Sequence, residues 1–149
     1  MTSPFAARPS ALGGGAFFKP ADHMNDLALL IEPKSIQRNV PSTYQGKTRD
    51  RDEVIADVTV FANLDSLDKG TPSEVLKSVK IVHGMLTSTL EKILNEATVA
   101  VIRKIPTQAG SGYAFRDPSI EDEAKVATYY TAREAAINDA VANAPSFDN

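Results

Sequence analysis

Residues 54–61 read Val-Ile-Ala-Asp-Val-Thr-Val-Phe, and this stretch decides the fold class. β-Branched side chains dominate it, and they favour extended backbone because they pack well on a pleated surface. Successive side chains of a strand point to opposite faces. One face is therefore apolar throughout, with Val54, Ala56, Val58 and Val60. The stretch predicts a strand that covers a hydrophobic core with that face.

Shorter apolar runs on both sides of this stretch predict four further strands, at residues 27–31, 75–82, 98–102 and 113–115. Pro33 is expected to end the first of them, because proline cannot donate a hydrogen bond inside a sheet. The polar stretches between the strands predict loops. Two of these loops span residues 40–50 and 63–72.

Two segments have the apolar periodicity of helices. Between the third and fourth strands, apolar side chains recur at helical spacing at Leu86, Leu90, Ile93, Leu94 and Ala97, which predicts a helix near residues 85–96. Ser119, followed three residues later by Asp122, is typical of a helix N-terminus. The long helix that follows carries an apolar face with Ile120, Val126, Tyr130, Ile137 and Val141.

The order of these elements predicts the fold. Three strands, a helix and two strands follow one another as in an OB-fold, a partly open Greek-key barrel. We therefore predict a mainly β protein with helices (α+β): a five-stranded OB-like Greek-key barrel, with a helix between strands 3 and 4 and an appended C-terminal helix. A generic small β-barrel or a split α+β sheet would give a similar pattern. The expected organisation is a flexible Gly/Pro-rich leader at 1–16, the barrel at 17–118, the C-terminal helix at 119–142 and a tail at 143–149.

The composition is that of one soluble globular domain. The chain has 149 residues, of which 42% are hydrophobic and 23% charged. No stretch approaches the roughly 20 apolar residues of a membrane span, and the N-terminus lacks the pattern of a signal peptide. We therefore expect a cytoplasmic protein with no membrane partner.

The residues that most enzymes need are scarce. The chain has no Cys and two His, His23 and His83, so thiolate nucleophiles and Cys-based metal sites are excluded. The common phosphate-loop, nucleophile-elbow and zinc-protease motifs do not occur. Asp50, Asp52, Glu53 and Asp57 could gather a magnesium ion, but the arginines beside Asp50 and Asp52 favour surface ion pairs. We expect no enzyme activity, no cofactor and no bound metal, and His83 as a packed or capping residue.

The net charge of −3 conceals alternating blocks of charge. Residues 33–51 hold five basic residues against one acid, and residues 77–104 hold five against two. Residues 52–76 hold six acids against one lysine, and residues 117–149 hold seven acids against two basic residues. A local basic face, rather than the net charge, decides whether a protein binds a polyanion. Scattered, solvated surface charge is the alternative explanation of the same blocks.

On an OB barrel, nucleic acid binds the face of strands 2 and 3 and the loops that join strands 1–2 and 4–5. In this chain those segments hold cations and aromatic rings: Arg38, Tyr44, Lys47, Arg49, Arg51, Lys77, Lys80, Arg103, Lys104, Tyr113 and Arg116. Cations in these places would follow a phosphate backbone, and the rings would stack on unpaired bases. Alternatively, Tyr113 and Phe115 share one strand face and both point into the core. We expect core packing for Phe115 and exposure for Tyr44.

The last third of the chain is acidic and would repel a polyanion. We expect a solvated helix face that is directed away from the basic surface. A tail at residues 145–149 that docks to partner proteins is the alternative.

A known family shows a comparable succession of blocks. In this chain the blocks are Leu29-Leu30-Ile31-Glu32-Pro33, Val40-Pro41-Ser42-Thr43-Tyr44, Ala56-Asp57-Val58-Thr59-Val60, Val79-Lys80-Ile81-Val82 before Gly84, residues 99–102, and a closing segment at 113–119. Over residues 17–130 the chain resembles the single-stranded DNA-binding proteins of phages that infect actinobacteria. Members often carry Trp in the closing segment, where this chain has Tyr113 as its nearest counterpart.

The resemblance implies an OB-like fold and a function without a cofactor. The implied function is sequence-neutral binding of single-stranded DNA, which protects exposed strands during phage DNA replication or recombination in the bacterial cytoplasm. Expected partners are single-stranded DNA, further copies of the chain in a homo-oligomer, and replication or recombination proteins. The alternative is a structural or scaffolding β-barrel of a virion or assembly, joined through its C-terminal helix and without affinity for DNA.

Overall fold

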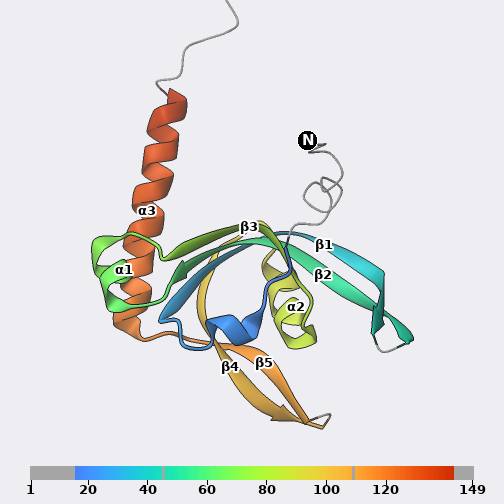
Figure 1. Cartoon of the computed structure of the whole chain (residues 1–149). Helices are drawn as coiled ribbons and strands as arrows, with labels where there is room; N and C mark the ends of the chain where they lie inside the picture. The colour runs from blue at the N-terminus through green and yellow to red at the C-terminus, as the bar shows by residue number, and fades with distance from the viewer. Residues whose placement is uncertain (1–15, 45, 109, 143–149) are drawn as a thin grey trace, which may run out of the picture.

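The computed structural model describes residues 16–44, 46–108 and 110–142. Five antiparallel strands form a sheet in the order β3-β2-β1-β4-β5, which curls into a half-barrel (Figure 1). The strands are β1 (Ala28–Tyr44), β2 (Lys47–Phe61), β3 (Glu74–Ile81), β4 (Thr98–Thr107) and β5 (Gly110–Arg116). The predicted fold class is confirmed: an α+β half-barrel with a helix between β3 and β4 and a long C-terminal helix.

The core lies on the face of the sheet that the sequence predicts. Val54, Ala56, Val58 and Val60 of β2 are all buried there. The helix α2 (Gly84–Leu90), continued by the short 3-10 turn η3 (Glu91–Ile93), covers this face with two buried leucines. Burial of this apolar surface is the main source of stability, and it fixes the register of β2 against its neighbours.

The loop prediction for residues 40–50 is wrong. These residues extend β1 and β2 into a long hairpin that turns between Tyr44 and Lys47, with Gly46 at a positive φ of 79°. The strand also runs through Pro33 instead of ending there. The carbonyl of Pro33 accepts a bond from Asn95, on the side where β1 no longer pairs with β4. The missing N–H of proline therefore lies at an open edge, where it costs no ladder bond.

The loop prediction for residues 63–72 is also wrong, because this segment contains α1 (Leu64–Lys69). Asn63 and Ser66 cap its first turn reciprocally, and Gly70 ends it in the left-handed conformation at a φ of 63°. An Asn at the start and a Gly just past the end are the ordinary signals of a short helix.

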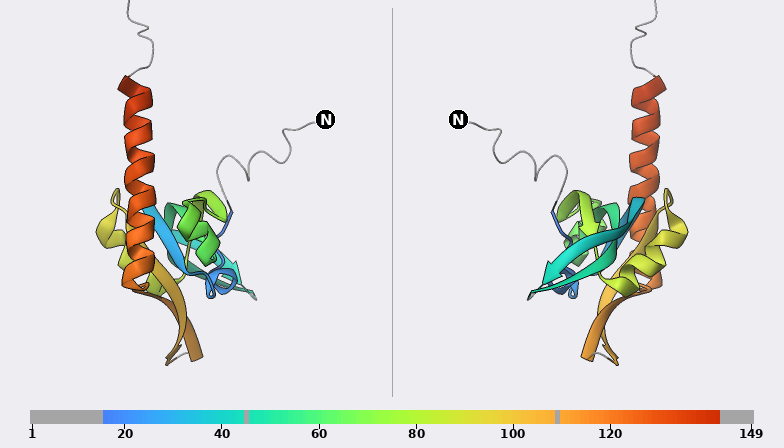
Figure 2. Two further views of the ribbon diagram at one scale, coloured as in Figure 1. Left: turned by 90° about the vertical axis from the view of Figure 1, so that its left-hand side faces the viewer. Right: turned by 90° about the vertical axis from the view of Figure 1, so that its right-hand side faces the viewer.

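The helix α3 (Ile120–Ala142) packs on the other face of the sheet with its first half only. Ser119 caps it, as predicted, by accepting a bond from the backbone of Asp122. Val126 is fully buried against Phe61, whereas Ile137 and Val141 are 50% and 71% exposed. The second half of the helix rises beyond the rest of the fold (Figure 2). Of the predicted apolar face, Val126 and Tyr130 therefore pack on the sheet, whereas Ile120, Ile137 and Val141 are exposed.

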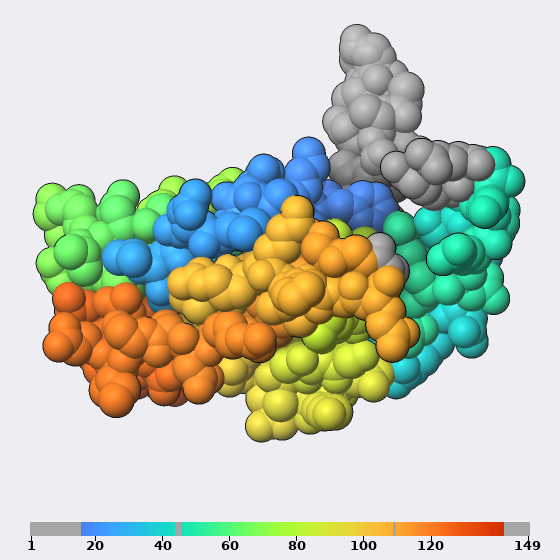
Figure 3. Space-filling model, turned by 90° about the horizontal axis from the view of Figure 1, so that it is seen from below, coloured from blue at the N-terminus to red at the C-terminus, as the bar shows by residue number. Residues whose placement is uncertain are grey.

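The first described residues bridge the open side of the half-barrel. Phe17 forms a parallel bridge with Lys80 at the edge of β3, and the turn η2 (Pro20–His23) follows. Arg103 of β4 then donates a hydrogen bond to the carbonyl of Met24. Seen from below, this segment (blue) and the β4–β5 hairpin (orange) lie between α1 and α3 at one end and the β1–β2 hairpin (teal) at the other (Figure 3). Among the helices described, none combines the length and apolar character that a bilayer span demands.

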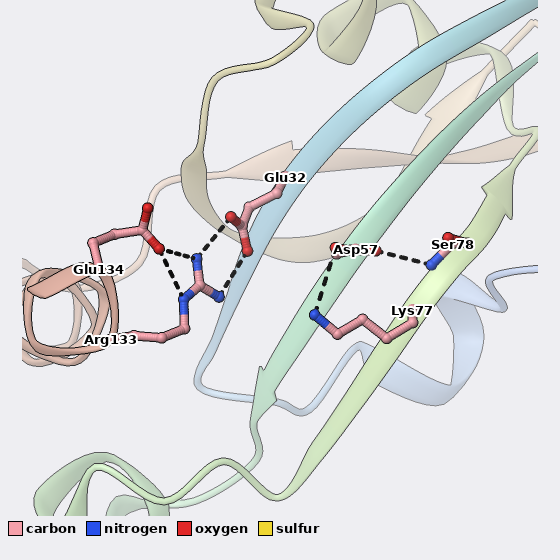
Figure 4. Close-up of polar contacts among 6 residues, drawn as sticks. All are labelled: Glu32, Asp57, Lys77, Ser78, Arg133 and Glu134. Atoms are coloured by element: carbon pink, nitrogen blue, oxygen red, sulfur yellow. Dashed lines mark hydrogen bonds and ion pairs between the residues drawn. The ribbon is translucent and has the colours of Figure 1, made fainter. Parts of the chain in front are cut away.

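Ion pairs hold α3 and β3 to the middle of the sheet. Glu32 of β1 and Asp57 of β2 are direct cross-strand partners, and like charges in such a pair repel each other. Arg133 of α3 forms two hydrogen bonds with Glu32, of 2.9 and 2.7 Å, and Lys77 of β3 lies 3.6 Å from Asp57 (Figure 4). Each acid thus has its own cation, and the Arg133 contact ties α3 to β1.

Replacing Arg133 with alanine should lower the free energy of unfolding by about 1.5–3 kcal/mol, because it leaves the largely buried Glu32 carboxylate unpaired. Lys125→Ala is the matched control, since Lys125 also ties α3 to the fold, by an exposed pair with Asp68. It should have little effect. Denaturant midpoints measure both variants. Equal midpoints for the two variants would contradict the role of Arg133 as the anchor.

Candidate nucleic-acid interface

An open groove of about 650 Å³ lies where the N-terminal segment, the β1–β2 hairpin and β5 approach one another. Its walls include Phe17, Ser42, Thr43, Arg51, His83 and Tyr113. These residues come from segments that are far apart in the sequence. The groove therefore exists only because the sheet curls and the chain start returns along the edge of β3.

At the polar end of β2, the cations lie on one face of the strand and the aspartates lie on the other. The sequence from residue 47 alternates Lys, Thr, Arg, Asp, Arg, Asp, so Lys47, Arg49 and Arg51 share one face of the strand. Asp50 and Asp52 lie on the opposite face. Lys47 and Arg49 are exposed, and no acid of the described residues forms an ion pair with either of them. A row of three cations thus leads along the hairpin into the groove.

Phe17 offers a flat ring at the end of this row. Its side chain is 48% exposed, although its backbone is fixed against β3. The guanidinium of Arg51 lies 5.4 Å from the ring centroid and the ammonium of Lys80 lies 5.5 Å from it. Both distances fall within the range of cation–π attraction. The two cations hold the ring in place and leave part of it open to a ligand.

Glu53 balances only part of this positive charge. Its side chain is almost fully buried, 3.4 Å from Arg51 and 3.8 Å from Lys80. One carboxylate faces two cations, so the cluster keeps a net positive charge. Glu53 therefore positions Arg51 and Lys80 beside Phe17 without cancelling their field.

Tyr113 forms the opposite wall. Its ring packs partly against the core and meets the ring of His83 edge-on, at 5.3 Å between centroids. Lys104 is its direct cross-strand neighbour and lies exposed on the same face of the β4–β5 hairpin. Phe115, two residues on, packs against the core as predicted. The β5 wall thus presents one half-buried ring and one cation.

Two side chains that line the groove each hold a buried nitrogen atom without a hydrogen-bond partner among the described residues. These atoms are Nε of Arg51 and Nδ1 of His83. Burial lowers the pKa of His83 below its ordinary value of 6.5, and the positive charge of Arg51 lowers it further. Both causes favour the neutral form of this imidazole. Buried polar atoms normally have a partner, so each of these two atoms has a hydrogen bond left to make.

The structure does not bring all the predicted cations to this groove. Arg38 pairs with Asp52 and Glu91, and these contacts raise its pKa. Lys77 pairs with Asp57, and Arg103 lines a different hollow, beside Asp117. These three cations are engaged elsewhere.

Two further predicted residues do not contribute a described contact to the groove. Arg116 is exposed and donates a hydrogen bond to the carbonyl of Phe115. Tyr44 ends β1, but its side chain lies outside the described part of the structure.

Sequence reasoning missed Phe17 and the part that His83 plays in the groove. Phe17 lies at the groove because it forms an isolated parallel bridge with Lys80, which is distant in the sequence. No local sequence pattern predicts such a pairing. His83 follows the end of β3 and meets Tyr113 across the open seam of the half-barrel. Its proximity to β5 follows from the closure of the fold.

No family model, curated protein or solved structure matches this chain. The resemblance to phage single-stranded DNA-binding proteins therefore rests on the sequence blocks alone and stays a prediction.

NMR titration of the His83 imidazole in the unliganded protein should give a pKa below 6.5. Because burial is the larger cause, Arg51→Gln should raise this pKa only part of the way back. A wild-type value at or above 6.5 would contradict the burial of this imidazole, and no response to the substitution would contradict its proximity to Arg51.

Proposed function

We propose that this protein binds single-stranded DNA without sequence preference and coats exposed strands. The observation that carries the proposal is the row of Lys47, Arg49 and Arg51 that leads into a groove with Phe17 and Tyr113 on its two sides. Cations that track a backbone and rings that stack on bases are the two components of sequence-neutral single-strand binding. Duplex DNA offers no unpaired bases to the rings, so single strands are favoured.

Each component contributes a different kind of affinity. A base stacked on an aromatic side chain contributes about 1–3 kcal/mol whatever its identity. Each phosphate neutralised by a cation releases counterions and makes binding dependent on salt. The resemblance to phage proteins supports a role in DNA replication or recombination. Replication or recombination proteins are then the expected partners, in the cytoplasm of a bacterial host.

Binding of oligo-dT should weaken steeply with salt. With about four phosphates neutralised, the slope of log affinity against log salt is on the order of −3, so a tenfold rise in salt costs roughly a thousandfold in affinity. Fluorescence anisotropy at several salt concentrations measures the slope. Absence of binding at low salt, or equal affinity for duplex, would refute the proposal.

Two kinds of substitution distinguish the contribution of the cations from that of the rings. Arg49→Ala should weaken binding to every sequence and flatten the slope by about 0.7. Phe17→Ala or Tyr113→Ala should lower the affinity by about 1–3 kcal/mol with the slope unchanged, because stacking releases no ions. Lys69→Ala on α1 is the control, since this exposed lysine pairs with Asp65 and lies outside the groove. It should bind like the wild type.

The exposed end of α3 favours a second candidate function, that of a structural protein which assembles through this helix. The apolar stripe that begins at buried Val126 continues to the exposed Ile137 and Val141. A second copy of the chain fits this stripe, because a two-fold axis places identical apolar residues opposite each other. Self-association also suits a DNA-coating protein, because linked sites raise the overall affinity.

Sedimentation should show an oligomer for the full chain and a monomer for Ile137→Glu, because a charge in the apolar contact leaves a carboxylate unpaired. Ala135→Glu, at an exposed position on the other side of α3, should remain an oligomer. A monomeric wild type would eliminate this interface. A large oligomer that lacks affinity for DNA would favour the structural function over DNA binding.

A further inference from the structure

We propose that Arg51 and His83 together bind a phosphate oxygen of the nucleotide whose base lies in the groove, and that His83 takes up a proton when it does so. The inference rests on the proposed function and assigns a ligand group to one position within it. It also makes DNA binding dependent on pH through a single named residue.

The two nitrogen atoms without hydrogen-bond partners indicate which ligand group would bind. Nε of arginine can only donate a hydrogen bond, and Nδ1 of a protonated imidazole also donates. Both side chains line the groove, and both atoms lie beneath its surface without a partner among the described residues, so a ligand reaches them when the two side chains turn toward it. A ligand atom that satisfies both must accept two hydrogen bonds. Phosphate oxygens do this and carry the negative charge that a guanidinium attracts.

The rings beside these nitrogen atoms indicate that the ligand is a nucleotide. The His83 ring rests edge-on against Tyr113, and the Arg51 guanidinium lies over Phe17. Each of these two side chains therefore contacts one of the two rings on which a base can stack: His83 contacts Tyr113, and Arg51 contacts Phe17. A nucleotide fits this arrangement better than an isolated anion, because its phosphate and its base are recognised side by side.

The charges around His83 decide the effect of such a ligand. Arg51 acts on it from β2, Tyr113 contacts it from β5, and Lys19 and Asp22 line the same groove from the N-terminal segment. Glu53 is held between Arg51 and Lys80. In the unliganded protein, burial and the Arg51 charge both lower the pKa of His83. A phosphate oxygen at Nδ1 has the opposite effect and raises it.

The direction of the pH dependence follows from the pKa of His83 in the free protein and in the complex with DNA. When a ligand raises the pKa of a group, the complex binds more protons than the free protein between the two pKa values. Affinity therefore increases as the pH falls through that window and is constant above it. Each unit by which DNA raises the pKa of His83 increases the affinity by up to about tenfold below the window.

The two histidines of this chain allow an internally controlled test. His23 does not itself line the groove, although its ring stacks on Phe18, which does, and Asp26 holds it in place, so its imidazole signals serve as the comparison in the same NMR spectrum. On saturation with oligo-dT, the His83 signals should shift further than those of His23, and the pKa of His83 should rise. The affinity should increase between pH 8 and pH 6, and His83→Gln should abolish this increase.

The outcomes separate this inference from the proposed function. If oligo-dT binds while the His83 pKa and signals stay unchanged, the inference is wrong and the DNA-binding function stands. If oligo-dT does not bind at all, both are wrong. Inorganic phosphate at the same concentration should leave His83 unchanged, because it makes no contact with the rings. A full shift with inorganic phosphate and none with oligo-dT would overturn the assignment to a nucleotide.

Discussion

The register of β2 is the constraint on which the rest of the structure depends. Four alternate apolar residues from Val54 to Val60 are buried, so a slip of one residue would turn all of them away from the core that α2 covers. The same alternation continues without interruption into the polar end of the strand. There it places Lys47, Arg49 and Arg51 on one face and the aspartates on the other. Packing of the core therefore also decides where the positive charge lies, and a single strand connects stability to the candidate interface.

Contacts across the open side of the half-barrel bring together the rings that line the groove. The hydrogen-bonded ladder ends at β3 on one side and β5 on the other. Phe17 joins the edge of β3, and Tyr113 of β5 meets His83 across the seam. The groove at this seam receives its rings from both sides and its cations mainly from the hairpin. The opposite end of the molecule carries α3, which is held by Arg133 and is acidic in its first turn. The acidic first turn of α3 thus belongs to a different element from the cations of the groove.

Patterns within single segments were predictable from the sequence. The valine alternation of β2, the helix between β3 and β4 and the cap at Ser119 are all present in the structure. The hairpin beyond Pro33 was not predictable, because its polar residues become a strand only through pairing with each other. α1 was missed although Asn63 and Gly70 signal it. Arg51 and Tyr113 were candidates from the start, whereas their convergence with Phe17 and His83 depends on contacts between distant segments, which no local periodicity records.

The central claim is that unpaired bases stack on the rings of this groove. Photocrosslinking of oligo-dT substituted with 5-iodouracil tests it most directly, because the crosslink forms where a base touches an aromatic side chain, and mass spectrometry locates the peptide. The account predicts crosslinks at Phe17 or Tyr113, which high salt abolishes together with binding. Crosslinks confined to Tyr129 and Tyr130 of α3, with the groove residues unmodified, would contradict it.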